Sequence, residues 1–140
     1  MKYLIMIALG LFLSTIGLYS QSYKVIVNKG NQSTSITSKE VSSYFLKKKT
    51  KWGNGQKVSP VELKANSSVR VDFSKGVHKK SVGAVKSYWQ QAIFSGKGTP
   101  PVEKKSDIEI IEYVKSHSGA IGYVSSGCDV SEVKVIKIIE

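Results

Sequence analysis

The order of strand-like and helix-like segments is the feature that most constrains the fold of this chain. Strand-like segments are dense in β-branched residues, whereas helix-like segments repeat apolar residues every three or four positions. The two kinds alternate only in part, in the order β-α-β-α-α-α-β-β, with connections too long for a β-meander. Such an order favours one mixed sheet flanked by helices. We therefore expect an α/β domain with about four strands and about four helices.

Capping and turn signals place the ends of these segments. Thr37 with Glu40, and Ser106 with Glu109, have capping-box spacing, in which each side chain satisfies a free backbone N–H group at a helix start. Gly119 is expected to end the last helix in a left-handed turn. The expected helices cover 37–46, 67–77, 81–93 and 106–118, the expected strands 23–28, 58–63, 120–124 and 132–139, and the expected loops and turns 29–36, 52–56 and 95–105. Pro60 has no backbone N–H to donate, so it indicates that the strand 58–63 lies at an edge of the sheet or contains a bulge.

The first 20 residues have the three parts of a secretory signal peptide: a positive charge at Lys2, an apolar run, and small residues near Ser20. The alternative is a retained membrane anchor. A span needs about 20 apolar residues, and this run is shorter and diluted by polar ones. We expect a signal peptide at 1–20, cleaved after Ser20 or Ser22, and one domain at 21–140 in the periplasm or outside the cell. The membrane is a partner only through an uncleaved signal.

The chain is strongly basic, with a net charge of +11, and among its 21 basic residues only Arg70 is an arginine. Such a surface attracts anions and anionic polymers, although a solvated loop explains the one dense lysine run at 47–51. An arginine kept against a lysine bias suggests a need for the fixed guanidinium fork. Cys128 is the single cysteine, so no internal disulfide forms, and we expect it to be buried or half-buried.

The sequence lacks the residue patterns of an enzyme. His78 and His117 are far apart, each near a predicted helix end, and neither has a metal-ligand neighbour at helical or hairpin spacing. There is no G-x-S-x-G elbow and no Walker loop. We expect no catalytic residues, no metal site and no cofactor.

One segment has a physical reason to bind a ligand. Residues 64–70 run from a strand through a small polar turn into a helix, where backbone N–H groups are unpaired. Hydroxyl groups and two cationic side chains add to these donors. An ordinary capped helix with a surface arginine is the alternative. The candidate ligand-binding residues for an oxyanion are Lys64, Asn66, Ser67, Ser68 and Arg70.

Four landmarks in order resemble the phosphate-binding periplasmic proteins of ABC transporters. They are Phe45 to Trp52, similar to the family's "IFLGK-x-x-x-W"; Pro60 to Phe73, similar to its "R-x-D-G-S-G-T…F" loop; Tyr88-Trp89 with Phe94 to Gly98; and Gly119 to Val124, similar to "G-[AS]-I-G-Y-V". The resemblance covers essentially all of the mature chain but only the second lobe of the two-lobed family. It implies a single-lobe periplasmic-binding-protein-like domain.

The resemblance also implies a function. The family's loop serine falls on Ser67 or Ser68, its arginine falls near Lys64, and Arg70 supplies a guanidinium from inside the helix. We expect an exported solute-binding-like domain that holds phosphate or a related oxyanion weakly, because one lobe cannot exclude water. The alternative is an extracytoplasmic interaction module that has lost its ligand and docks on an envelope protein or transporter through an apolar strip near Trp52 or Trp89. A third alternative is a domain that binds acidic polymers electrostatically through its lysine-rich surface. We expect no specific nucleic acid as a partner.

Overall fold

The computed structural model describes residues 21–140, so the predicted signal peptide at 1–20 lies outside the described residues. In the described part of the chain, no helix combines the length and apolar character that a membrane crossing requires.

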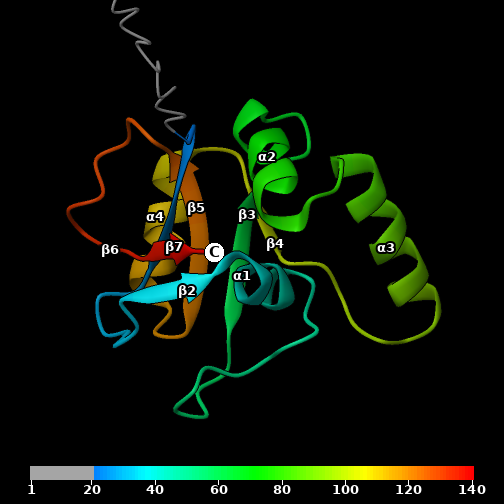
Figure 1. The fold of residues 1–140 in the computed structure, drawn as a ribbon, viewed down its shortest axis with the longest axis horizontal. Helices are drawn as coiled ribbons and strands as arrows, with labels where there is room; N and C mark the ends of the chain where they lie inside the picture. Colours follow the sequence, from blue (N-terminus) through cyan, green and yellow to red (C-terminus); the bar gives the residue numbers. More distant parts are fainter. Residues whose placement is uncertain (1–20) are drawn as a thin grey trace, which may run out of the picture.

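A mixed five-stranded sheet forms the centre of the domain, with strand order β4-β3-β5-β1-β6 (Figure 1). Its strands are β1 (Tyr23–Val27), β3 (Ser59–Leu63), β4 (Val102–Lys104), β5 (Ala120–Ser125) and β6 (Lys134–Val135). β3, β4 and β5 are parallel to one another, whereas β1 is antiparallel to both β5 and β6. The predicted α/β class with a mixed sheet and four helices is therefore confirmed.

The helices cover both faces of this sheet. They are α1 (Ser38–Phe45), α2 (Ser68–Phe73), which continues as the π-helical turn η1 (Ser74–His78), α3 (Val82–Phe94) and α4 (Asp107–Ser116). Side chains that neighbour each other on β5 point to opposite faces. A Cβ atom at Gly122 would meet Ile110 and Val114 of α4, whereas Tyr123 packs on Phe73 of α2. Helix α4 therefore lies on one face, and α1 and α2 lie on the other.

Aromatic rings fill the space beneath α1 and α2. Phe73 stacks on Tyr123 with ring centroids 3.9 Å apart, and the edge of Phe45 meets Phe73 at 4.9 Å. All three side chains are buried. This packing fixes α2 against the sheet and thereby sets the direction of the turn that precedes it.

Helix α3 stands at the side of the domain (Figure 1). It rests on a small separate cluster of buried residues made by Leu46, Val85, Trp89 and Ala92. Both tryptophans are buried, Trp52 in the main core and Trp89 in this cluster. The expected apolar strip at a tryptophan is therefore wrong.

The N-cap half of each predicted capping box is confirmed. The Thr37 hydroxyl accepts the Glu40 N–H at 3.1 Å, and the Ser106 hydroxyl accepts the Glu109 N–H at 3.2 Å. The reciprocal half differs from the prediction, because Glu40 contacts Tyr44 and Lys49 and Glu109 accepts the Lys105 N–H.

Gly119 plays a different part from the one expected. The helix ends earlier, and Gly119 is not in the left-handed region. Its lack of a side chain is needed because a Cβ atom there would collide with the Lys57 carbonyl oxygen.

The strands that the sequence analysis missed are short. β2 (Ser35–Thr37) begins in a predicted loop and pairs with β7 (Lys137–Ile139), and β4 lies in the predicted loop 95–105. The predicted strand 132–139 is divided at Ile136, where the chain passes from the central sheet to the two-stranded one. These strands exist because of partners far away in the sequence, which a local pattern cannot show.

Pro60 does not lie on an edge strand, since β3 has neighbours on both sides. However, β4 begins to pair only at Val61, so Pro60 lies opposite Ile121 of β5 with no β4 residue on its other side. The missing N–H of Pro60 therefore removes no bond to β4.

Candidate functional site

The predicted ligand-binding residues surround the turn between β3 and α2. The N–H of Ser67 donates to the Lys64 carbonyl at 2.9 Å and closes the turn. The Ser67 hydroxyl then accepts the Arg70 N–H at 3.4 Å as the N-cap of α2. Because β3, β4 and β5 run parallel, the turn lies at the edge where their carboxyl ends meet, and open α/β sheets bind ligands outside that edge.

The five residues divide into two groups by exposure. Lys64, Asn66 and Ser68 are exposed, Ser67 is half-buried, and Arg70 is buried at 4% relative exposure. The structure thus brings all five into one short segment but directs only the first group to solvent. Whether any of them binds a ligand stays a prediction.

Arg70 points back into the protein. Its Nη1 atom donates to the Leu63 carbonyl at 3.1 Å and to Glu103 Oε1 at 2.8 Å, and its Nη2 atom lies 3.1 Å from Glu62 Oε1. One guanidinium thus joins the end of β3 to β4 and to the first turn of α2. Two carboxylates and a carbonyl occupy the fork that the sequence analysis assigned to an anion.

Burial controls the protonation of Glu62. The side chain is 3% exposed, and this burial raises its pKa from the usual 4.5 to about 7, although the charge of Arg70 opposes the change and Glu103 adds to it. The group therefore titrates close to neutral pH, where a small change in its surroundings changes its charge.

Solved structures of phosphate receptors share this fold. The chain matches an ABC-type phosphate transport receptor from Vibrio cholerae with a TM-score of 0.67 and 20% identity, over 84% of this chain and 46% of the receptor. It also matches a putative phosphate ABC transporter substrate-binding protein from Clostridium perfringens, solved with bound phosphate, with a TM-score of 0.65 and 19% identity over 84% and 44% of the two chains. A third match is a possible phosphate-binding protein from Planctomyces limnophilus. Its TM-score is 0.61 and its identity 16%, over 85% of this chain and 42% of that protein.

This chain has the fold of part of a phosphate-transport receptor. It spans less than half the length of the receptors that it matches. No protein-family model and no curated protein matches the sequence. The predicted periplasmic-binding-protein-like fold is confirmed, whereas its assignment to the second lobe stays a prediction.

The sequence analysis missed two residues that contact Arg70, Glu62 and Glu103. Glu62 is the only charged residue in the apolar strand Ser59–Leu63, and a charge within a buried strand is a signal that it has a partner. Glu103 carries no such signal, because its strand lies in a segment that reads as a loop. Within residues 21–140, no three His, Cys, Asp or Glu side chains form a group that could hold a metal ion.

Proposed function

We propose that this chain is an exported solute-binding-like domain that binds phosphate or a related oxyanion at the exposed turn 64–68. The observation that carries the proposal is the match with a receptor solved with bound phosphate, which covers 84% of this chain. The prediction that the chain is not an enzyme is part of the proposal, since the matched proteins are transport receptors and substrate-binding proteins.

The turn offers donors of the kind that an oxyanion needs. Lys64 supplies an ammonium group, Asn66 an amide and Ser68 a hydroxyl, all exposed at the same edge of the sheet. Charge-assisted hydrogen bonds from such groups favour an anion over water. When the domain at 21–140 is tested by itself, the ligand would lie half in solvent, so we expect a dissociation constant of roughly millimolar to high micromolar.

In this proposal Ser67 and Arg70 position the turn. Ser67 caps α2, and Arg70 fixes the end of β3 through Leu63 and Glu103. Three protein acceptors already contact the guanidinium of Arg70, and its side chain is buried, so the proposal assigns the anion contacts to the exposed residues of the turn.

Phosphate titration followed by amide chemical shifts tests the proposal. Phosphate should shift the backbone signals of residues 64–69 at constant ionic strength, and Lys64→Ala with Ser68→Ala should weaken this binding several-fold. Lys75→Ala is the matched control, because Lys75 is equally exposed but lies in η1. Equal weakening by the control, or shifts spread over all lysine-rich surfaces, would mean that phosphate only screens charge.

The proposed export has its own test. N-terminal sequencing of the protein from the cell envelope or the medium should give Gln21 or Tyr23 as the first residue. A protein that keeps Met1 would contradict cleavage of a signal peptide and support the membrane-anchor alternative.

A second candidate function is an extracytoplasmic protein-interaction module, and one observation favours it. Phe94 is 95% exposed at the end of α3, beside the half-exposed Ile93. Lys86 on the same helix and Lys97 just after it are exposed, so an envelope protein surface with apolar and acidic side chains would complement this part of the molecule.

Site-specific photo-crosslinking separates this candidate from the first. A benzophenone side chain at position 94 should join one defined envelope protein, whereas the same group at the exposed Ile108 of α4 should not. Equal products from both positions would remove the reason to assign a partner to α3.

A further inference from the structure

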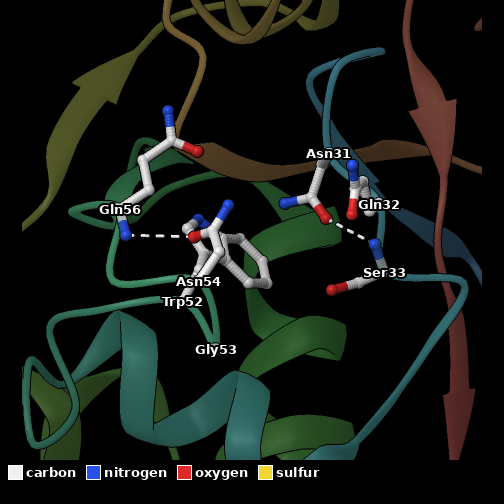
Figure 2. Close-up of a pocket in the computed structure, with 7 residues that line it drawn as sticks. All are labelled: Asn31, Gln32, Ser33, Trp52, Gly53, Asn54 and Gln56. Carbon is white, nitrogen blue, oxygen red and sulfur yellow. Dashed lines mark hydrogen bonds between the residues drawn. The ribbon is translucent and has the colours of Figure 1, made fainter.

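A small polar cleft lies at the edge of the sheet opposite the 64–68 turn (Figure 2). It has a volume of about 250 Å³, and two loops line it, residues 31–33 after β1 and residues 52–56 before β3. These loops meet where β1 ends and where β3 and β5 begin, so the cleft shares no residue with the proposed oxyanion site.

Two asparagine side chains in the cleft have fixed orientations. The Asn31 Oδ1 atom accepts the Ser33 N–H at 2.8 Å, and the Asn54 Oδ1 atom accepts the Gln56 N–H at 3.0 Å. Since each amide oxygen holds a backbone donor, each NH₂ group must point the other way. Figure 2 shows the two NH₂ groups facing one another across the cleft.

These NH₂ groups are donors without a protein acceptor. Among the described residues neither Nδ2 atom makes a hydrogen bond, although Asn31 is only 9% exposed. Asn54 is exposed and Asn31 keeps a small exposed surface, so both NH₂ groups can reach water or a ligand. Two convergent donors on opposite walls are therefore suited to hold one oxygen atom between them.

The remaining lining supplies one acceptor and an apolar surface. Gln56 donates through Nε2 to the Ser118 hydroxyl at 2.6 Å, which leaves its Oε1 atom free to accept. The Trp52 indole N–H is used by the Gly119 carbonyl at 2.9 Å, so Trp52 offers only its carbon ring at the base of the cleft. No charged side chain lines the cleft.

We propose that this cleft binds a neutral saccharide unit. A sugar hydroxyl can accept from the Asn31 and Asn54 amides and donate to Gln56. The C–H groups of a sugar can contact the small part of Trp52, 6% of the residue, that is exposed. An anion would have no cation among the lining residues. A peptide group also offers an acceptor and a donor, so the experiment includes N-methylacetamide to separate it from a saccharide. This proposal is independent of the oxyanion site, because the two lie at opposite edges of the sheet and use different residues.

The side-chain NH₂ signals of Asn31 and Asn54 in ¹H–¹⁵N spectra test the proposal directly. Glucose, galactose and N-acetylglucosamine, each added at tens of millimolar, are the saccharide probes. We expect at least one of them to shift both NH₂ pairs in a saturable way. Sodium phosphate, sodium acetate and N-methylacetamide are the comparison probes and should leave these signals in place.

Substitutions locate the site. Asn31→Ser and Asn54→Ser keep an oxygen that can accept the same backbone N–H but remove the NH₂ donor, and each should weaken saccharide binding about tenfold. Gln90→Ser, at an exposed position on α3, should leave binding unchanged. The proposal is overturned if no saccharide shifts the NH₂ signals, if phosphate, acetate or N-methylacetamide shifts them as much, or if both Asn variants bind as the parent does.

Discussion

The sheet-centred body of the domain and helix α3 are held in place by different means. In the body, helices cover both faces of the sheet, and residues such as Val27, Val61 and Ile121 have no exposed surface. Helix α3 rests on one row of side chains around Trp89, while Phe94 on the same helix is almost fully exposed. We therefore expect the body to contribute most of the folding free energy, and α3 to open by itself more readily than the body does.

The largest effect should come from Arg70, whose ion pairs lie in the body. Arg70→Ala would leave Glu62 buried without its cationic partner, and breaking a buried pair in this way costs about 3–5 kcal/mol of unfolding free energy. Urea unfolding measures the loss, and the exposed Lys64→Ala is the control, expected within about 0.5 kcal/mol of the parent. A loss for Arg70→Ala as small as that of the control would mean that the guanidinium is free in solution, and direct anion contact would regain support.

A smaller and more local effect is expected in α3. Trp89→Ala removes the centre of the small cluster and should cost about 3 kcal/mol, the low end for truncation of a large aromatic core residue, because the poorly covered helix can relax. Hydrogen exchange should show that 82–94 loses protection while β1 and β5 keep theirs. Loss of protection throughout the domain would show that α3 and the body fold as one unit, which would contradict the comparison.

The sequence predicted correctly those features that depend on residues close together in the chain. The caps at Thr37 and Ser106 and the Trp52–Gln56 turn each depend on residues a few positions apart. Prediction from the sequence failed where the reason is remote. From the sequence, Arg70 was predicted to contact a ligand. In the folded protein it contacts Glu103, which lies 33 residues away in the chain.

The polar cleft shows the same limit. Its Asn54 lies in a predicted turn and its Asn31 in a predicted loop, yet only the folded sheet brings the two loops together. The only sequence signal for the cleft is the presence of Asn and Gln in two loops. This signal is weak, since Asn side chains in loops usually bond to the backbone of their own turn. The fold class could thus be predicted from the sequence, whereas the contacts that select among possible sites could not.

The pH dependence of the unfolding free energy tests whether Glu62 is buried in the body as the structure has it. Glu62 has a pKa raised to about 7 in the folded protein by burial, against 4.5 in an unfolded chain. Between these values the folded state keeps a proton that the unfolded state has lost, so raising the pH lowers stability, by up to about 1.4 kcal/mol per pH unit. Glu62→Gln should lack this slope.

The measurement is the difference between the two unfolding free energies from pH 4.5 to pH 7. His78 acts in the opposite direction, because burial lowers its pKa from 6.5 to about 4 and the unfolded state takes up a proton first as the pH falls. His78 is present in the parent and in Glu62→Gln, so its contribution cancels when the two unfolding free energies are subtracted. Parallel curves would show that Arg70 keeps Glu62 ionised throughout this range.

The smallest effect on stability is expected at the tip of α3. Phe94 is 95% exposed, so Phe94→Ser removes almost no buried surface and should change the unfolding free energy by less than about 0.5 kcal/mol. Its effect on association should be larger, since Phe94 is the most exposed of the large hydrophobic residues within 21–140 and lies beside the half-exposed Ile93. Co-sedimentation of the purified parent and of the variant with cell-envelope proteins measures this. A marked loss of stability would place Phe94 inside a packed interface of the folded domain and remove the contrast between a well-covered body and a partly uncovered helix.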